Sequence, residues 1–434
     1  MTTVADPNRS RGGVDGRTIV WDPATATEEA VLPGPAGHVE DAKVSRDAST
    51  LYTAAVGGVV LAWDLTGKRG FGLSAHFSRA LPCCDWVSPP EPALALSPDG
   101  SRFAVSIGAS TVGLFSTRTL APLGSFTIAP ADVRITALAW SPNGAALAVG
   151  ADRGVVQVWN VTGAPRIERS LDGLAPVPGL AEAVQSLAFS PDRRLLAATD
   201  KSEGTTVGHT LASPLATMAI WNLRRGMLVG PTASLGAGNG LTGSDEAAFS
   251  RDGKLLAASL LAGGIGVFDP STGQLLRTLA DPSDESTALA FGTGTTLAAG
   301  TIGGAVEMWD AATGRRLAPP LLADTEEITD VAFDQSGQRF VTTGHEDGTI
   351  KLWFTAGLQQ DGPRLASDAG STPAAAFDPR GGGLLVVDDR GGAFTWPTEL
   401  AAWEQRACMI AGRNLTRTEW TELVGGPSYT GVCP

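Results

Sequence analysis

The sequence ITDVAFDQSGQRFVTTGHEDGTIKLW, residues 328–353, contains three short apolar segments separated by turn residues. Residues 329–333 alternate between apolar and polar side chains, residues 339–343 follow Gln335-Ser336-Gly337, and residues 349–353 follow Asp347-Gly348. Strands of about five residues with an Asp-Gly turn predict an antiparallel meander. One meander cannot bury its own faces, so other parts of the chain must cover it.

The same pattern recurs along most of the chain, and each unit ends its third strand with an aromatic residue. Six of the eight steps between these aromatics are 41 to 47 residues long, and the other two are 52 and 62. A repeat of this length predicts a β-propeller of four-stranded antiparallel blades. The aromatics are Trp21, Trp63, Phe115, Trp159, Trp221, Phe268, Trp309, Trp353 and Trp396.

The repeat unit combines a turn of the F-S-P-D-G type, a strand of small residues, a second turn with Asp and Gly, and an apolar strand ending in Trp-Asp. This unit resembles the WD-repeat family of β-propellers. The resemblance implies a hydrogen-bonded network that joins a Gly-His pair, a turn Asp and the terminal Trp. Only His38 matches the His clearly, and Asp152, Asp347 and Asp389 match the turn Asp. We therefore expect apolar packing and main-chain hydrogen bonds to hold most blades.

The two ends of the repeat array complement each other. Residues 16–22 form a third strand without a first and a second strand before it, and residues 29–32 can serve as a fourth. Residues 374–377, 384–387 and 393–396 form three strands without a fourth. An N-terminal strand that completes the last blade would leave no open sheet edge. The strand count favours eight blades, and a ring of seven with leftover strands is the alternative.

Three regions follow from this organisation. Residues 1–14 are polar and predicted to be disordered, residues 15–396 form the propeller, and residues 397–434 form a tail. In the tail, Leu400, Trp403, Ala407 and Ile410 recur at helical spacing, and Thr416 with Glu419 marks the start of a second helix. We expect this helix pair to pack on the propeller as a cap, with a partner-binding helix as the alternative.

Small side chains in the second strands predict close contact between blades. The segments 147–149, 195–198, 255–258 and 297–299 read LAV, LLAA, LLAA and LAA. Blades that stack around an axis need such small residues, and a recurring first-strand aromatic fills the space between neighbours. These aromatics are Trp140, Phe189, Phe249, Phe291, Phe333 and Phe377.

Composition limits the possible partners and compartments. The 434 residues carry 32 basic and 45 acidic side chains, a net charge of −13. This charge argues against nucleic acid as the main partner. The N-terminus has no apolar signal region and no stretch of about 18 apolar residues occurs, which predicts a soluble, cytoplasmic protein without membrane contact. The four cysteines, Cys83, Cys84, Cys408 and Cys433, lack zinc-ligand spacing. They are expected to be reduced thiols, with a Cys408–Cys433 disulfide as the alternative in an oxidising compartment.

Two long connections interrupt the repeat and are the predicted partner-binding sites. Residues 67–92 lie between a fourth and a first strand, and residues 199–217 lie between a second and a third strand. Both connections belong on the same rim of an up-and-down meander, and recognition residues concentrate in such loops. The alternative is that both are solvated insertions without a binding role. The candidate contacts are His76, Phe77, Arg79, Trp86, Lys201, Glu203 and His209.

No catalytic, metal-binding or phosphate-binding motif is found in the sequence. We therefore expect a non-catalytic scaffold or sensor that binds a protein or peptide on the rim, without a cofactor or a metal. The alternative is a propeller enzyme or small-ligand binder that uses the central channel, because the architecture supports both classes.

The C-terminal run ACMIAGRNLTRTEW, residues 407–420, with Tyr429 and Cys433-Pro434, resembles the ending of large bacterial WD-repeat proteins. In many of these a STAND-type signalling NTPase lies upstream of the propeller. The resemblance implies a bacterial source, a sensor role and a STAND-type NTPase module as the partner.

Overall fold

The computed structural model describes residues 93–398 apart from short segments, together with seven strands that precede residue 93. The segments left out are 173, 175–181, 203–205, 208–209, 212–214, 238–245, 262, 280–284, 346–347, 362–364, 367–372, 380–382 and 389–391. The chain divides into two compact units, Leu73–Glu399 and a second that combines Met1–Gly72 with Leu400–Pro434. The predicted propeller start at residue 15 thus differs from the start of the first unit.

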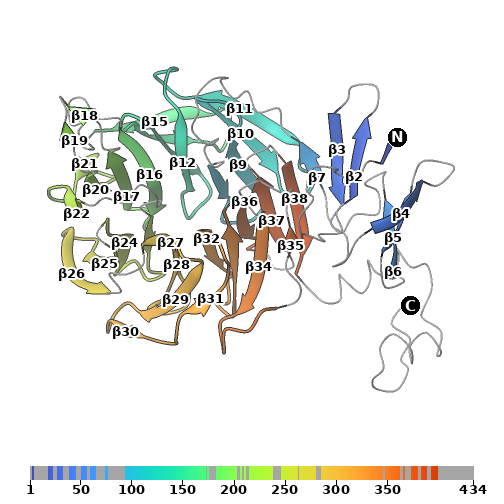
Figure 1. The fold of residues 1–434 in the computed structure, drawn as a ribbon. Coiled ribbons are helices and arrows are strands. Elements are labelled where there is room, and N and C mark those ends of the chain that lie inside the picture. Colours follow the sequence, from blue (N-terminus) through green and yellow to red (C-terminus); the bar gives the residue numbers. More distant parts are fainter. Residues whose placement is uncertain are drawn as a thin grey trace. The chain divides into compact units, whose positions relative to one another are not determined.

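The unit Leu73–Glu399 contains seven blades, each an antiparallel meander (Figure 1). Blade 1 comprises β8 (Leu94–Leu96), β9 (Arg102–Ser106), β10 (Thr111–Ser116) and β11 (Pro122–Thr127). Blade 2 comprises β12 (Ile135–Trp140), β13 (Ala146–Ala151), β14 (Val156–Asn160) and β15 (Arg166–Leu171). Blade 3 comprises β16 (Glu182–Phe189), β17 (Leu195–Ser202), β20 (Leu215–Asn222), β21 (Met227–Leu228) and β22 (Ala233–Ala237).

The other four blades repeat this order. Blade 4 comprises β23 (Ala247–Phe249), β24 (Leu256–Ser259), β25 (Ile265–Asp269) and β26 (Gln274–Leu279). Blade 5 comprises β27 (Ser286–Phe291), β28 (Thr296–Thr301), β29 (Ala305–Asp310), β30 (Arg315–Arg316) and β31 (Leu321–Leu322). Blade 6 comprises β32 (Ile328–Phe333), β33 (Arg339–Gly344), β34 (Thr349–Phe354) and β35 (Leu365–Ala366). Blade 7 comprises β36 (Pro373–Phe377), β37 (Gly383–Asp388), β38 (Gly392–Pro397) and β7 (Ser74–His76).

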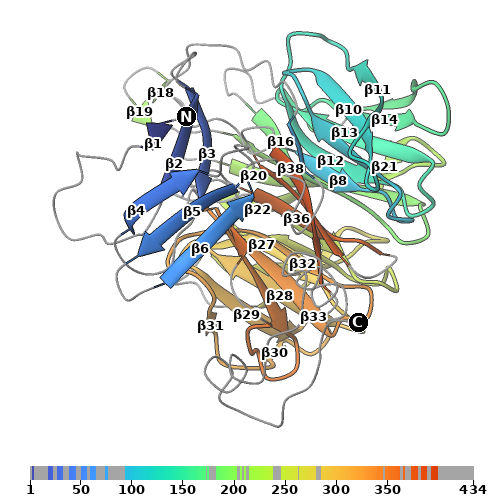
Figure 2. The same cartoon turned by 90° about the vertical axis from the view of Figure 1, so that its right-hand side faces the viewer.

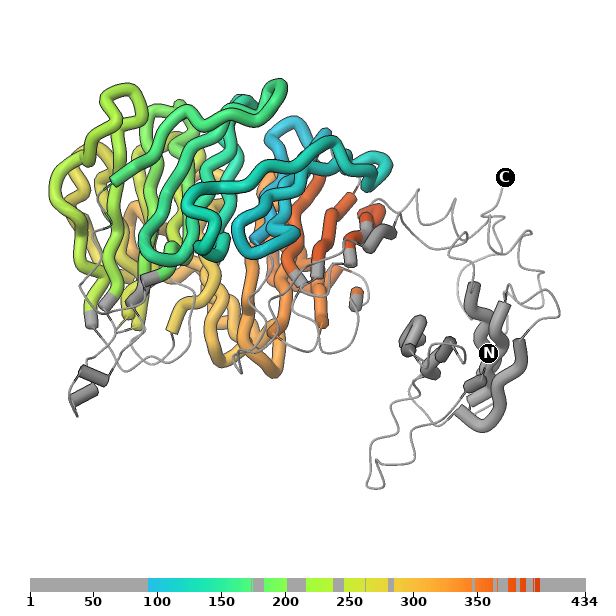
Figure 3. Tube along the Cα trace, turned by 90° about the horizontal axis from the view of Figure 1, so that it is seen from above, coloured from blue at the N-terminus to red at the C-terminus, as the bar shows by residue number. Residues whose placement is uncertain are grey.

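The seven blades close into a ring. The first strands touch one another in the cyclic order β8, β12, β16, β23, β27, β32, β36 and again β8. Several of these first strands, such as β27, β32 and β36, gather near the middle of the view in Figure 2. In Figure 3 the strands of blade 7 near the end of the ring, in red, run beside the strands of blade 1, in blue.

An earlier strand completes the last blade, as predicted, but it is not the predicted strand. β7 pairs with β38, and residue Ala75 faces Ala393. The predicted closing segment 29–32 instead lies in β3 (Thr27–Leu32), which pairs with β2 (Thr18–Asp22), and β2 pairs with β1 (Thr2–Thr3).

The prediction of eight blades is therefore wrong. The strand ending near Trp21 is β2, and Trp63 lies in β6 (Val59–Asp64), which forms a separate sheet with β4 (Val39–Val44) and β5 (Thr50–Ala55). Both sheets belong to the unit that contains Met1–Gly72, and each has three strands. The other seven predicted third-strand aromatics, from Phe115 to Trp396, each lie in the third strand of one blade.

Small residues lie where neighbouring blades meet, as predicted. A Cβ atom added at Gly150 in β13 would approach Val184 Cγ1 of blade 3 to 2.5 Å, and one added at Gly300 in β28 would approach Ile328 Cγ2 of blade 6 to 2.5 Å. Ala148, Ala198, Ala258 and Ala298 are fully buried.

Among the described residues, side-chain hydrogen bonds tie the innermost strands together at six of the seven blade boundaries. In each case a side chain at or beside one first strand bonds to the main chain of the neighbouring first strand. Such bonds add to the apolar packing and fix the ring at its centre. The bonds are Trp140 Nε1–H to Ala95 O, Thr136 Oγ1–H to Val184 O, Ala247 N–H to Ser186 Oγ, Leu289 N–H to Glu246 Oε2, Thr287 Oγ1–H to Ile328 O, and Ala375 N–H to Asp330 Oδ2.

The described part of the chain contains strands and turns but no helix. Accordingly, no helix in this part is long and apolar enough to cross a membrane. The predicted tail helices fall on residues 397–434, and residues 399–434 lie outside the described residues.

Candidate functional site

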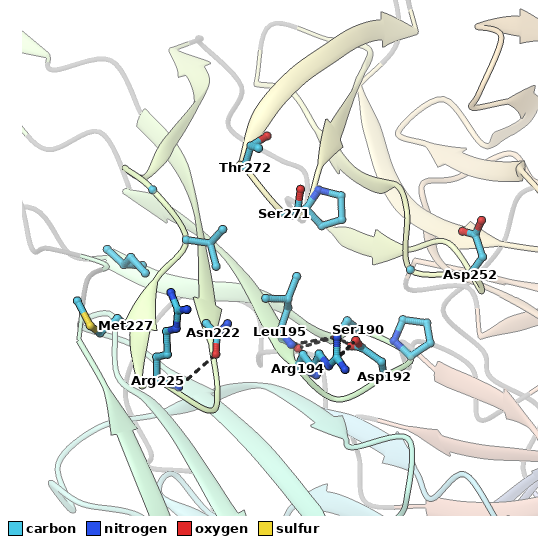
Figure 4. A pocket seen from close by; sticks show the side chains of 16 residues that line it. Ser190, Asp192, Arg194, Leu195, Asn222, Arg225, Met227, Asp252, Ser271 and Thr272 are labelled. Carbon is cyan, nitrogen blue, oxygen red and sulfur yellow. Dashed lines mark hydrogen bonds and ion pairs between the residues drawn. The ribbon is translucent and has the colours of Figure 1, made fainter.

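A groove of about 720 Å³ lies between blades 3 and 4. Four turns line it: the 1–2 and 3–4 turns of blade 3 and the same two turns of blade 4. In an up-and-down meander the 1–2 and 3–4 turns share one face, so the groove opens on the face opposite the predicted rim. Figure 4 shows Leu195 in the middle of the groove, pointing toward the turn that carries Ser271.

The 1–2 turns on both sides of the groove have the same construction. In blade 3, Ser190 Oγ–H donates to Asp192 Oδ1 at 2.7 Å, and Leu195 N–H donates to Ser190 Oγ at 2.9 Å. In blade 4, Ser250 Oγ–H donates to Asp252 Oδ1 at 2.7 Å. These Ser-x-Asp turns recur around the ring and place a carboxylate at each side of the groove.

Both carboxylates carry a lowered pKa. Burial raises the pKa of Asp192, but hydrogen bonds from Ser190 and from Arg194 N–H outweigh it and bring the pKa below its usual value. The Ser250 hydroxyl, followed by Lys254 N–H, lowers the pKa of Asp252. The groove therefore presents two anionic side chains at neutral pH.

The 3–4 turn of blade 3 supplies the other end of the groove. Asn222 Oδ1 accepts hydrogen bonds from the N–H groups of Arg224 and Arg225 at 3.1 Å each, which fixes the turn. Met227 follows, with 66% of its surface exposed. Figure 4 places Arg225 and Asp252 at opposite ends of the groove.

Two other blade boundaries show what fills the equivalent space elsewhere in the ring. Arg102 of blade 1 donates to Val161 O at 2.9 Å and to Gly144 O at 3.0 Å, both in blade 2. Its guanidinium lies 4.8 Å from the ring centre of Trp140. The contact is a clamp across the boundary, combining charge-assisted hydrogen bonds with a cation–π contact.

Arg339 of blade 6 makes the corresponding contact, donating to Thr398 O beyond the third strand of blade 7 at 3.2 Å. The main-chain pattern identifies the equivalent positions, because Ser97, Ser190 and Asp334 each donate N–H to the carbonyl five residues on. The residues at that carbonyl are Arg102, Leu195 and Arg339. Leu195 thus occupies the clamp position at the boundary between blades 3 and 4.

A proline that lines the groove on the facing blade removes a hydrogen bond found in other blades. In blades 1, 2, 3, 5 and 6 the residue two places after the third-strand aromatic donates its N–H to the 1–2 turn of its own blade. Pro270 has this position in blade 4 and has no N–H to donate. The two turns of blade 4 therefore lack the bond that joins them elsewhere. The donors in the other blades are Thr117, Val161, Leu223, Ala311 and Thr355.

Two of the seven predicted rim residues, His76 and Lys201, lie among the described residues. His76 ends β7 and pairs with Gly392, so part of the predicted connection 67–92 is a blade strand. Lys201 lies in β17 and pairs with Ala183 and Ala216. The connection 199–217 separates the second and third strands as predicted and includes β18 (Thr206–Val207) and β19 (Thr210–Leu211). Phe77, Arg79, Trp86, Glu203 and His209 lie outside the described residues.

Among the described residues, one turn Asp and some of the terminal Trp residues make hydrogen bonds to other partners than those of the predicted family network. Asp152 Oδ1 accepts from Arg134 N–H at 2.9 Å, which ties the 2–3 turn to the start of the blade. Trp353 Nε1–H donates to Thr342 Oγ1 at 3.0 Å, and Trp309 Nε1–H to Glu307 Oε2 at 3.1 Å. His38, Asp347 and Asp389 lie outside the described residues.

Among the described residues, no group of three or more His, Cys, Asp or Glu side chains is placed to hold a metal ion. The residues that the sequence did not single out are those of the groove, above all Leu195 and Pro270. Pro270 departs from blades 1, 2, 3, 5 and 6, in which the equivalent residue donates its N–H to the 1–2 turn. The position of Leu195 holds arginine in blades 1 and 6 and an apolar residue or glycine in blades 2, 4 and 7 (Ala146, Leu255 and Gly383).

Comparison with known proteins identifies the repeat. Residues 122–160 and 321–353 match the family model described as WD domain, G-beta repeat. Each match begins on the fourth strand of one blade and ends on the third strand of the next, so one sequence repeat bridges two blades. The chain therefore contains WD40 repeats within a β-propeller.

Two similar curated proteins carry the name Telomerase protein component 1. The Mus musculus protein is 28% identical over 264 residues, and the Rattus norvegicus protein is 26% identical over 264 residues. Each alignment covers 60% of this chain and 9% of the relative, so the chain spans only a small part of the relatives' length. These relatives lend no support to the predicted bacterial source or STAND-associated tail.

Proposed function

We propose that this chain is a non-catalytic interaction scaffold, a propeller that holds a protein or peptide partner in the cytoplasm. The observation that carries the proposal is the groove between blades 3 and 4, set in a ring whose innermost strands are tied together at six boundaries. A rigid scaffold that presents a groove with few convergent polar groups is suited to recognition. The relatives' name describes them as protein components of telomerase, which fits a part of a larger assembly.

The rim that carries residues 67–92 and 199–217 is a second element of this proposal. Its proposed contacts remain His76, Phe77, Arg79, Trp86, Lys201, Glu203 and His209. A protein partner is favoured over nucleic acid because the chain carries a net charge of −13. A STAND-type NTPase module is the partner class that the tail's resemblance suggests.

Site-specific photo-crosslinking tests the proposal. A benzoylphenylalanine is placed at Met227 in the groove, at His209 in the rim connection, or at the exposed Leu123 in blade 1 as the control. We expect one protein to cross-link at Met227 or His209 and not at Leu123 in cells that express the intact chain. Cross-linking that is equal at all three sites, or absent from all of them, would refute the scaffold role.

A further inference from the structure

The contact that Arg102 makes at another blade boundary shows which ligand the groove would bind. At the boundary between blades 1 and 2, the guanidinium of Arg102 reaches the carbonyl oxygens of Gly144 and Val161. The equivalent residues at the boundary between blades 3 and 4 are Gly253 and Pro270, and both line the groove. Gly253 N–H donates to Ser250 O at 2.8 Å, and Gly144 N–H donates to Ser141 O at 2.8 Å, so the two turns have matching main-chain paths.

These two carbonyl groups receive no hydrogen bond from the described residues. Leu195 stands where the arginine would be, and its side chain has no donor. Neither the carbonyl oxygen of Gly253 nor that of Pro270 accepts a hydrogen bond from any of the described residues. A carbonyl at the edge of a groove remains available to a ligand that brings its own N–H groups.

The charge of this end of the groove suits the same ligand. Asp252 lies beside Gly253 on the wall of blade 4, and Asp192 lines the groove from blade 3. Arg194 Nε lies 3.3 Å from Asp192 Oδ2, so part of the charge of Asp192 is compensated within blade 3. Asp252 pairs only loosely, at 3.5 Å, with the exposed Lys254. A guanidinium offers five donors in a planar fork and binds carbonyl and carboxylate oxygens together.

We infer that the groove between blades 3 and 4 binds an arginine side chain from an extended segment of a partner protein, through the carbonyl oxygens of Gly253 and Pro270 and the carboxylate of Asp252. The inference rests on the proposed scaffold function and names the chemistry of the partner. The bound arginine would take the place that Arg102 and Arg339 take at their own boundaries.

The test uses the intact chain and a fluorescein-labelled capped peptide, Gly-Ala-Arg-Ala-Gly, in fluorescence polarisation. Matched peptides carry lysine, citrulline or glutamate in place of arginine. We expect the arginine peptide to bind about tenfold or more tightly than the others, because charge and fork geometry are both needed. Equal binding of the lysine or citrulline peptide, or tighter binding of the glutamate peptide at Arg225, would overturn the inference.

Leu195→Arg is the decisive variant, because it supplies the missing clamp from within the chain. We expect it to weaken binding of the arginine peptide about tenfold or more while the melting temperature stays the same or rises. Leu123→Arg adds the same charge on exposed β11 and should leave binding unchanged. Ser271→Trp blocks the groove without changing the clamp position, and keeps the test valid if Leu195→Arg fails to fold.

The outcomes separate this inference from the proposed function. If a partner cross-links at Met227 but no arginine peptide binds, the arginine inference falls and the scaffold role stands. If Leu195→Arg and Ser271→Trp both fold and bind the peptide as well as the unchanged chain does, the groove is not the binding site and the inference also falls.

Discussion

Arg102 shows how much one side chain contributes where two blades meet. Replacing it with leucine removes the hydrogen bonds to the carbonyl oxygens of Gly144 and Val161 and the contact with Trp140. We expect Arg102→Leu to lower the free energy of unfolding by about 2 kcal/mol, as is usual for hydrogen bonds to a charged group. Urea denaturation of the variant and of Arg118→Leu, an exposed arginine of the same blade, measures the difference. The clamp role is refuted if both substitutions cost the same.

Asp200 makes the free energy of unfolding fall as the pH rises, whereas most carboxylates make it increase. It is 5% exposed and accepts hydrogen bonds from the N–H and the hydroxyl of Thr217. Burial raises its pKa, and the Thr217 bonds offset this only in part. In the folded chain the group holds its proton to a higher pH than in the unfolded chain, where the pKa is about 3.9. Its cost to stability therefore appears as the pH rises from about 4 through the raised pKa, and is complete above it.

Asp200→Asn removes this titration and keeps an acceptor oxygen for Thr217. We expect the free energy of unfolding of the variant, relative to that of the unchanged chain, to increase as the pH rises from about 4 to neutral. Parallel urea titrations at several pH values provide the measurement. A difference that does not change with pH would show that Asp200 has the same pKa in both states.

At the scale of strands, contact with the neighbouring blade limits the size of the side chains in the second strand. A Cβ at Gly150 would lie 2.5 Å from Val184 Cγ1 and 3.3 Å from Ala137 Cβ. We expect Gly150→Ala to cost about 1–3 kcal/mol of unfolding free energy, because the packed boundary cannot expand freely. Gly163→Ala, where an added Cβ meets nothing within 4 Å, is the matched control.

A double substitution identifies the cause. Combining Gly150→Ala with Val184→Ala removes the overlapping methyl groups, so the pair should cost less than the sum of the two single changes. Additive costs would mean that the contact with the methyl groups of Val184 is not the cause, since the Cβ of residue 184, 2.9 Å from the added Cβ, remains.

The strands themselves were predictable from sequence, and the positions that line the groove were not. Alternation and turn residues mark a strand locally, so all seven third-strand aromatics from Phe115 to Trp396 were placed correctly. The groove is lined by Leu195 and Pro270, two ordinary apolar residues. Their effect is visible only once Arg102 is known to clamp the equivalent boundary. The local sequence of one blade does not indicate which hydrogen bonds are missing in the neighbouring blade.

At the scale of the whole molecule, the period of the sequence repeat does not determine the number of blades in the ring. The segments ending near Trp21 and Trp63 have the same local pattern as the ring strands, yet they form sheets of three strands in the other unit. The closing strand β7 has only three residues and lies in a segment that reads as a long connection. Ring closure is decided by which strands pair. A strand of three residues has too short a pattern of apolar and polar residues to predict its partner strand.

Closure by β7 is testable by truncation, because the unit Leu73–Glu399 contains β7 and every other ring strand. A chain of residues 73–399 should unfold cooperatively as a seven-bladed ring. A chain of residues 77–399 lacks β7 and leaves the edge of β38 unpaired. An open edge strand promotes pairing with another molecule, so we expect the shorter chain to melt at a lower temperature and to self-associate. Circular dichroism melting and light scattering of both chains measure the two effects. If residues 73–399 are no more stable than residues 77–399, β7 does not close the ring.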